Sequence, residues 1–334
     1  MIYHFPRPRS DLPRPADALS LAGSAHVWFS AIDSLARDRR PCAAAPGMAE
    51  RLAQPRPVLS GLPVDRPLVM GIVNATPDSF SDGGEAHGLA AAIARAQALV
   101  TAGADILDIG GESTRPGAED VPDAEEIART APVIAALREA GIATPVSIDT
   151  RKAAVAEAAL AAGADIINDV SALTHDPALA GVVAEAGVPV CLMHAQGTPQ
   201  TMQADPRYDD VLLDVHDALA RRMDFALSRG IAAERLIVDP GIGFGKTLAH
   251  NLALLKGLAL LHGLGAPILL GASRKRFIGT ISGVEEAGAR MPGSLAVALH
   301  AAAQGAQIIR VHDVAATVQA LALWRALTNK ESEA

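Results

Sequence analysis

The chain is poor in the residues that mark several large classes of protein. Its 334 residues include only two cysteines, and aromatic residues make up 3% of the total. Cys42 and Cys191 lie far apart, which fits neither a disulfide framework nor the usual spacing of metal ligands. The net charge is −8 and there is no basic run, so a groove for nucleic acid has neither its cations nor its stacking rings.

Long apolar runs are also missing, although half of the residues are apolar. No run reaches the ~18 residues that a membrane-spanning helix needs. The N-terminus lacks the charged, apolar and small-residue regions of a secretory signal. We therefore expect a soluble cytoplasmic protein that binds neither nucleic acid nor a membrane.

Residues 1–66 differ from the rest of the chain. Prolines recur at positions 6, 8, 13 and 15 and again at 41, 46, 55 and 57. This composition predicts a partly ordered N-terminal extension with one or two short helices or strands. A regular domain is expected over 67–328, followed by a short tail at 329–334, and no chemistry is evident in the extension.

From residue 68 onward, short apolar runs end abruptly on polar residues. Continuous apolar runs of this length are typical of parallel strands that are buried on both faces. Eight such runs occur, at 68–73, 106–109, 146–148, 166–167, 188–193, 236–238, 268–270 and 308–309.

Alanine-rich segments with helical periodicity follow these runs, and several end at a glycine. They are predicted at 88–102, 123–140, 152–162, 176–186, 208–229, 248–261, 290–304 and 313–328. Eight strand–helix units in about 260 residues match the number and length of a (β/α)8 barrel, or TIM barrel. A doubly wound open sheet is the alternative, but no glycine fingerprint follows the first strand. In a barrel the carboxyl ends of the strands form one rim, where active sites lie.

Three polar residues stand directly after predicted strands. Asp149, Asn168 and Asp239 can form paired hydrogen bonds with a heterocycle that has an amidine-like edge. Any one of them alone would more often cap the following helix. Three on one rim favour a ligand site.

A cationic group is predicted on the same rim from Lys275, Arg310 and His312, with Arg115 opposite. The ends of strands seven and eight are the usual phosphate site of this fold, and arginine binds phosphate oxygens bidentately. A surface salt bridge is the competing interpretation of Arg115. Alternation along an extended chain lets at most one of residues 274–276 point inward.

Two tempting motifs are set aside. The stretch 241–247 (GIGFGKT) resembles a nucleotide P-loop, but position 240 is proline where the first glycine should stand. His194 lacks partners at metal-ligand spacing, so a structural role is favoured. The histidines at 175, 216, 250 and 262 are expected on the surface of helices or loops.

Eight sequence motifs stand in order along the chain: GIVNATPDSFSDGG (71–84), DIGGESTRPGA (108–118), SIDTRK (147–152), IINDV (166–170), CLMHAQGTPQTMQ (191–203), VDPGIGFGKT (238–247), GASRKRFIG (271–279) and GSLAVALHAAAQGAQIIRVHDV (293–314). Together they resemble the dihydropteroate synthase family over about residues 66–326. The resemblance implies condensation of 6-hydroxymethyl-7,8-dihydropterin pyrophosphate with p-aminobenzoate, which yields 7,8-dihydropteroate and pyrophosphate. It also implies Mg²⁺ as cofactor, sulfonamides as competitors of p-aminobenzoate, and a homodimer. The apolar predicted helices 290–304 and 313–328 are candidates for the dimer interface.

The resemblance also implies a role for individual residues. The pterin would be held by Asp149, Asn168, Asp239 and Lys275, with Met193 against its ring. The pyrophosphate would be held by Asn74, Arg310 and His312, and Asn74 would also bind Mg²⁺. The p-aminobenzoate site would be framed by Phe80, Thr114, Arg115, Pro116, Phe244, Ser273 and Lys275. Asp149, Lys275 and Arg310 would be the catalytic residues.

Two other functions are compatible with a pterin-binding barrel. A corrinoid-linked methyltetrahydrofolate methyltransferase would not need the pyrophosphate clamp that residues 114–116 and 273–275 suggest. A non-catalytic pterin-binding protein would not need every expected polar position, yet all are present.

Overall fold

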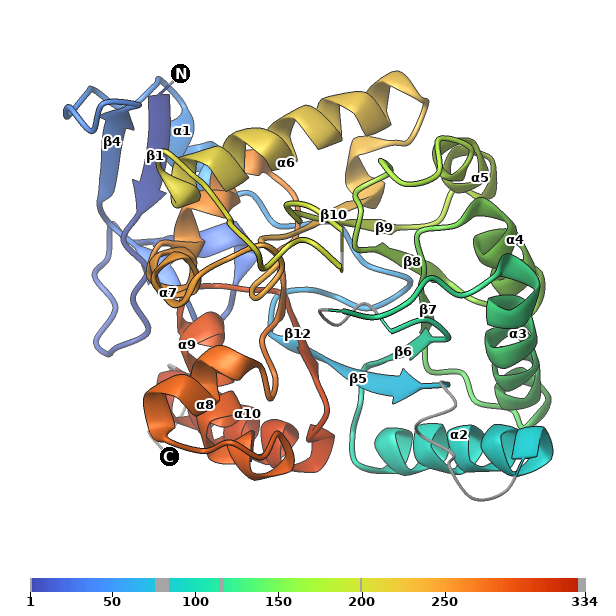
Figure 1. Ribbon diagram of the computed structural model, residues 1–334. Coiled ribbons are helices and arrows are strands. Elements are labelled where there is room, and N and C mark those ends of the chain that lie inside the picture. The colour runs from blue at the N-terminus through green and yellow to red at the C-terminus, as the bar shows by residue number, and fades with distance from the viewer. Residues whose placement is uncertain (1, 76–83, 114–116, 199, 330–334) are drawn as a thin grey trace.

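The computed structural model describes residues 2–75, 84–113, 117–198 and 200–329 of the chain. Eight parallel strands form its centre (Figure 1). They are β5 (Leu68–Asn74), β6 (Ile106–Gly110), β7 (Val146–Asp149), β8 (Ile166–Asp169), β9 (Val190–Met193), β10 (Leu236–Asp239), β11 (Leu269–Gly271) and β12 (Ile308–Val311).

The strands close into a barrel. Their order in the sheet is β10-β9-β8-β7-β6-β5-β12-β11, so each strand pairs with its neighbour in sequence and β12 pairs with β5. A single parallel bridge between Val238 and Ile268 joins β10 to β11. The predicted (β/α)8 barrel is therefore confirmed, and the open-sheet alternative is wrong because no free edge is left between β10 and β11.

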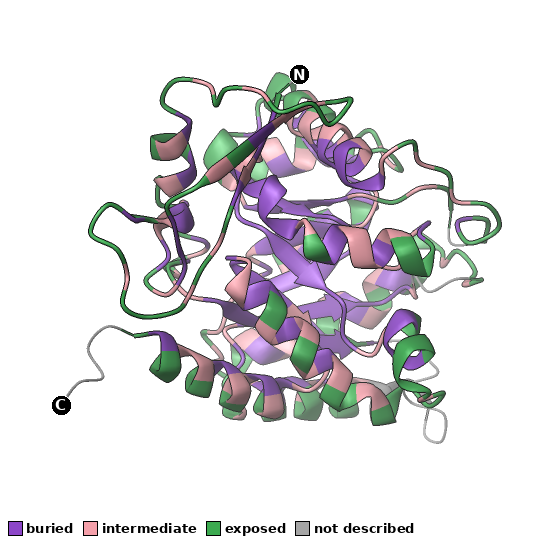
Figure 2. Cartoon of the chain, turned by 90° about the vertical axis from the view of Figure 1, so that its left-hand side faces the viewer, coloured by how far each residue is buried: buried purple, intermediate pink, exposed green. Residues whose placement is uncertain are grey.

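Helices surround the barrel on the outside, with their buried faces toward the strands (Figure 2). They are α2 (Gly84–Thr101), α3 (Asp123–Glu139), α4 (Ala153–Ala161), α5 (Leu179–Ala186), α6 (Val211–Ser228), α7 (Leu248–Lys256), α8 (Arg276–Ser282), α9 (Met291–Ala303) and α10 (Val314–Thr328). Eight of these helices match the predicted helical segments in chain order, whereas no helix was predicted where α8 lies. Segment 248–261 differs, because α7 ends at Lys256 and a 3-10 helix, η4 (Leu258–Leu264), follows Gly257.

The extension packs beside α6 (Figure 1), and it also contacts η4 and α10. It contains the strand pairs β1 (Ile2–Pro6) with β4 (Ile32–Ala36) and β2 (Leu19–Ser20) with β3 (Trp28–Phe29), the 3-10 helix η1 (Leu21–Gly23) and the helix α1 (Met48–Ala53). Leu21, Phe29 and Leu52 form a small core of their own, on which Trp324 of α10 packs. Polar contacts complete the attachment: the Tyr3 hydroxyl donates to Asp217 over 2.8 Å, and Arg37 pairs with Asp214 and Asp217.

This packing corrects one prediction. His216 and His262 are buried rather than on the surface, because the extension covers them. The Tyr3 ring contacts the His216 ring edge-on at 5.4 Å between centroids. The Arg56 guanidinium donates to the backbone oxygen of His262 over 2.9 Å. No helix in the described parts of the chain is long and apolar enough to span a bilayer.

Candidate active site at the carboxyl rim of the barrel

The predicted pterin-binding residues lie side by side at one end of the barrel. Asp149 ends β7 and pairs in register with Asn168 of β8, while Asp239 ends β10 opposite Met193 of β9. Asp149, Asn168 and Asp239 are 8%, 4% and 5% exposed. Rigid strands therefore hold these polar groups at the edge of the barrel interior, as the sequence predicted.

Arg310 of β12 crosses the barrel mouth to two carboxylates. Its Nε atom donates to Asp108 over 2.5 Å and its Nη2 atom to Asp149 over 2.6 Å. In the described part of the chain, no donor reaches the buried Oδ1 atom of Asp149. A buried acceptor without a partner is costly, so this atom is suited to a hydrogen-bond donor on a ligand.

Sequence reasoning missed Asp108. It lies inside an apolar strand and is fully buried. The amide nitrogen of Asn168 lies 3.3 Å and 3.5 Å from its two carboxylate oxygens. The available signal was the isolated charge within the buried run 106–109, since charged residues are almost never buried without a partner.

Lys275 is the inward residue of the predicted cationic turn. Arg274 instead pairs with Asp313, and Arg276 is exposed. The Lys275 ammonium donates to the backbone oxygen of Ile242 and lies 4.4 Å from the centre of the Phe244 ring. Its stem passes Gly243, where φ is +86° and a Cβ atom would come within 3.2 Å of the lysine Cδ. The glycine thus makes room for the lysine.

Burial shifts the pKa values of these charged groups. Burial raises the pKa of Asp149 to about 7, although Arg310 opposes the change, and it also raises the pKa of Asp239. Burial lowers the pKa of Lys275 to about 8, against the attraction of Asp239. Perturbed pairs of this kind in one recess are typical of functional sites.

The remaining predicted residues are placed around this centre. Asn74 ends β5 and is exposed, and Met193 ends β9 at 4% exposure. The Ser273 hydroxyl lies 3.2 Å from the backbone nitrogen of His312 and 3.0 Å from its Nδ1 atom. Phe80 and residues 114–116 (Thr114, Arg115 and Pro116) lie outside the described residues.

His194 has a structural role. Its Nδ1 atom is 3.0 Å from the ammonium of Lys246, which also donates to the backbone oxygens of His194 and Phe244. Burial lowers the pKa of His194 to about 3, so the imidazole is neutral and accepts from the lysine. In the described residues no group of three or more His, Cys, Asp or Glu side chains is placed to hold a metal ion. Because Lys246 bonds to both His194 and Phe244, it links the segment that follows β9 to the segment that follows β10.

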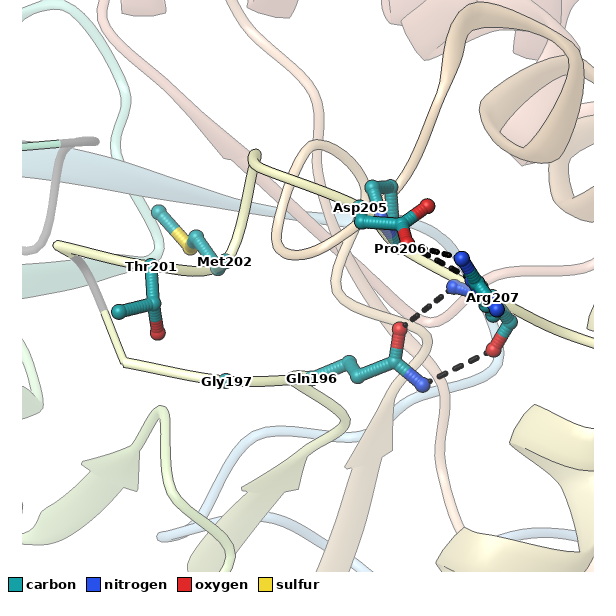
Figure 3. A pocket seen from close by; sticks show the side chains of 7 residues that line it. All are labelled: Gln196, Gly197, Thr201, Met202, Asp205, Pro206 and Arg207. Atoms are coloured by element: carbon teal, nitrogen blue, oxygen red, sulfur yellow. Dashed lines mark hydrogen bonds and ion pairs between the residues drawn. The ribbon is translucent and has the colours of Figure 1, made fainter.

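Two hollows adjoin the rim. One, of about 270 Å³, is lined by Phe244 and by residues that follow β7, β8 and β9, among them Arg151, His175 and Met202. The other, of about 220 Å³, lies within the segment that follows β9 (Figure 3). There the Gln196 side chain bonds to the backbone nitrogen and oxygen of Arg207, each over 3.0 Å. This second hollow contains none of the predicted site residues.

Comparison with known proteins decides the family. Residues 70–312 match the family model described as pterin binding enzyme. The dihydropteroate synthase of Neisseria meningitidis serogroup B is 50% identical over 269 residues, which is 79% of this chain and 94% of that protein. The chain belongs to the dihydropteroate synthases. The enzyme of Escherichia coli K12 is 47% identical over 275 residues, 82% of this chain and 96% of that protein.

Solved structures agree. Xanthomonas albilineans dihydropteroate synthase with 4-aminobenzoic acid is 52% identical and has a TM-score of 0.76 over 82% of this chain and 98% of that one. The same enzyme in complex with 7,8-dihydropteroate is 49% identical, with a TM-score of 0.74 over 82% and 98% of the two chains. The protein is therefore a transferase of folate biosynthesis. It condenses 6-hydroxymethyl-7,8-dihydropterin pyrophosphate with p-aminobenzoate to give 7,8-dihydropteroate and pyrophosphate.

Proposed function

We propose that the rim residues divide the dihydropteroate synthase reaction among three groups of side chains. Asp149, Asn168, Asp239 and Lys275 hold the pterin, and Met193 packs against its ring. Asn74, Arg310 and His312 hold the pyrophosphate. Phe244, Ser273 and Lys275 frame p-aminobenzoate, together with Phe80, Thr114, Arg115 and Pro116. The observation that carries this division is the contact of Lys275 with both the Phe244 ring and the Ile242 carbonyl, beside the buried carboxylates.

The pterin side of the site offers acceptors where the heterocycle has N–H donors. Asp149 has an unpartnered buried oxygen among the described residues, and Asp239 and Asn168 add further polar atoms at the same depth. Lys275 supplies a donor to the ring. Because Asp149, Asn168 and Asp239 are more than nine-tenths buried, their bonds form away from competing water, which strengthens them.

Mg²⁺ fits the residues present at the pyrophosphate side. Asn74 is exposed at the end of β5 and offers an amide oxygen. Magnesium typically takes one or two protein oxygens and completes its shell with water and substrate phosphates, so a cluster of three protein ligands is not required. Held by Asn74 and the substrate, the ion would neutralise charge on the pyrophosphate.

The reaction then proceeds through the pterin methylene. The bond between this carbon and the pyrophosphate oxygen breaks, and its electron pair leaves with the pyrophosphate. Arg310 stabilises the charge that develops on the leaving group. The ionised Asp149 carboxylate stabilises positive charge on the pterin. The neutral amine of p-aminobenzoate forms the new carbon–nitrogen bond and releases a proton to solvent, so no strong base is needed.

The second substrate site is supported by neighbours. A solved relative from Xanthomonas albilineans contains 4-aminobenzoic acid, and one from Yersinia pestis contains a sulfonamide drug. We propose that sulfonamides compete with p-aminobenzoate in this protein as well. Phe244 supplies an aromatic wall and the Lys275 ammonium, close to that wall, supplies a positive charge for the ring carboxylate.

The wider organisation is also proposed. Residues 1–66 are a separate extension, 67–328 the catalytic barrel and 329–334 a tail, and the enzyme acts in the cytoplasm. A homodimer is proposed through the C-terminal helices. Leu323 and Leu327 of α10 are 64% and 71% exposed, and Met291 at the start of α9 is 37% exposed. Leu323 and Leu327 stand four residues apart on α10 and so share one face of that helix, and exposed large apolar side chains grouped in this way favour a protein contact.

The test is a pyrophosphate-release assay with and without p-aminobenzoate. Release that depends on p-aminobenzoate, with 7,8-dihydropteroate formed in equal amount, is expected. Turnover of methyltetrahydrofolate with a corrinoid protein, and none with the pterin pyrophosphate, would overturn the assignment. Tight binding of the pterin pyrophosphate without turnover would indicate a non-catalytic binding protein.

A further inference from the structure

The carboxylate of Asp108 lies beneath the side chains that are proposed to bind the substrates, and it contacts two of them. It receives Arg310 Nε at 2.5 Å and Asn168 Nδ2 at 3.3 Å. Asp108 is fully buried, so it does not reach a substrate itself. No step of the proposed reaction uses it, yet its two partners belong to the pterin and pyrophosphate groups of the site.

The bond to Asn168 determines which atom of the amide faces the substrate. An ionised carboxylate only accepts hydrogen bonds, so the amide must turn its NH₂ group toward Asp108. The amide oxygen is then left for the barrel mouth, and in the described residues it has no other partner. An oxygen there accepts from a ring N–H, whereas the flipped amide would present a second donor.

The bond from Arg310 to Asp108 likewise fixes the orientation of a side chain, here the guanidinium of Arg310. Asp108 holds Nε of Arg310 while Nη2 donates to Asp149, so two bonds fix the plane of the guanidinium. A ligand that draws Nη2 away from Asp149 leaves the arginine attached at Nε. The side chain then needs little reordering when an anion binds, which lowers the entropic cost of binding.

We propose that Asp108 is a positioning residue for the condensation reaction, one that orients Asn168 toward the pterin and Arg310 toward the pyrophosphate from a single carboxylate. The proposal rests on the function proposed for those two residues. Asp108 then lies beneath the residues that bind the pterin and the pyrophosphate, and away from the p-aminobenzoate site. Its replacement should therefore weaken the use of the pterin pyrophosphate and leave the binding of p-aminobenzoate unchanged.

Asp108→Asn and Asp108→Glu test this role. The first keeps the shape and removes the charge, so that the amide at 168 is no longer forced into one orientation. The second keeps the charge and displaces it by one methylene. For both variants we expect kcat/KM for the pterin pyrophosphate to fall at least 100-fold, while KM for p-aminobenzoate stays within threefold of the wild-type value. The Kd of 6-hydroxymethylpterin, measured by calorimetry, should rise at least tenfold.

Asp105→Asn is the matched control. Asp105 stands three residues earlier, directly before β6, and its carboxylate also pairs with an arginine, Arg66, at 2.6 Å. It lies at the opposite end of the strand, so its loss should leave both kinetic constants unchanged. Thermal unfolding of all variants separates folding defects from altered sites.

The proposal is overturned if Asp108→Glu retains wild-type kcat/KM, since charge balance alone would then suffice. It is equally overturned if the activity lost in Asp108→Asn equals the fraction unfolded, with an unchanged Kd for 6-hydroxymethylpterin in the folded fraction. Should the wild-type enzyme bind this pterin but release no pyrophosphate, the assigned reaction fails, and the calorimetric comparison still tests the role of Asp108.

Discussion

The two ends of the barrel interior use the same strands for opposite purposes. On five strands an inward apolar residue near the amino end is followed two positions later by a residue of the rim: Ile106 and Asp108, Ile166 and Asn168, Cys191 and Met193, Ile237 and Asp239, and Ile308 and Arg310. The first member of each pair belongs to a buried apolar cluster, which Leu59 and Val64 of the extension close from below. Because strand side chains repeat every two residues, the two members are only about 7 Å apart.

The difference shows how this fold separates stability from chemistry. The lower cluster removes apolar surface from water and so stabilises the barrel. The rim instead holds the carboxylates of Asp108, Asp149 and Asp239 away from water, which costs free energy that hydrogen bonds and ion pairs, such as those of Arg310, only partly return. We therefore expect substitutions at the rim to affect turnover and substitutions in the apolar cluster at the other end, the floor of the barrel, to affect stability.

The largest effect on turnover is expected from Lys275→Ala. Loss of the ammonium removes a donor to the pterin and a charge beside Phe244, so kcat/KM should fall about 1,000-fold, or roughly 4 kcal/mol. The melting temperature should not fall, because a buried lysine with a lowered pKa contributes little to folding. Steady-state kinetics and calorimetry check both. Lys256→Ala, an exposed lysine in the last turn of α7, is the control. Full activity in the Lys275 variant would refute its role.

Arg310→Ala should lower both turnover and stability, because this rim residue also pairs with two buried carboxylates. Turnover should nearly vanish, and the free energy of unfolding should fall by roughly 3–5 kcal/mol because two buried carboxylates lose their cation. Denaturant titration measures the second effect. Equal stability of this variant and the wild type would show that the barrel mouth relaxes enough to hydrate Asp108 and Asp149.

Ile106→Ala, at the floor of the barrel, should lower stability without lowering turnover. Removal of a fully buried side chain leaves a cavity and should lower the free energy of unfolding by roughly 2–5 kcal/mol. Activity per folded molecule should stay unchanged at temperatures below the transition. A large loss of kcat without a loss of stability would break the proposed separation between the two ends.

The pH dependence of kcat/KM should follow the rim. Lys275, with a pKa of about 8, must be protonated to hold the substrate, so activity should fall about tenfold per pH unit above 8. Asp149, with a pKa of about 7, must be ionised, so activity should rise up to that pH. Lys275→Arg should move the upper limb beyond pH 10 in whatever activity remains. An unchanged upper limb in that variant would assign it to another group.

The ionisation of Asp149 should lower the stability of the fold as the pH rises, although it raises the activity. Its pKa in the folded protein lies above the ordinary value of 3.8, so the folded state keeps a proton that the unfolded state has released. Stability is therefore greatest at low pH from this group and is lost as the pH rises from 4 through 7. Asp149→Asn should flatten that decline in urea titrations, and an equally steep decline in the variant would assign it to a different buried group.

The smallest effect is expected at the extension. Arg37 pairs with Asp214 and Asp217 on α6, but its side chain is 47% exposed. Exposed ion pairs contribute little to stability because water and salt screen them, so Arg37→Gln should shift the melting temperature by only about 2 °C and leave turnover unchanged. Leu52→Ala, in the core of the extension, should be clearly more destabilising. If both variants unfold alike, the attachment to α6 depends on polar contacts.

By itself the sequence determined the barrel and the rim. Apolar runs ending on Asp149, Asn168 and Asp239 reveal the strands and their polar ends because buried parallel strands have few other compositions. Only the tertiary structure decided that Lys275 turns inward while Arg274 binds Asp313, since that choice depends on backbone dihedrals and on a partner 39 residues away. It likewise revealed Asp108 beneath Arg310 and the burial of His262 under Arg56. Such contacts join residues about 200 positions apart, and local periodicity carries no information over that distance.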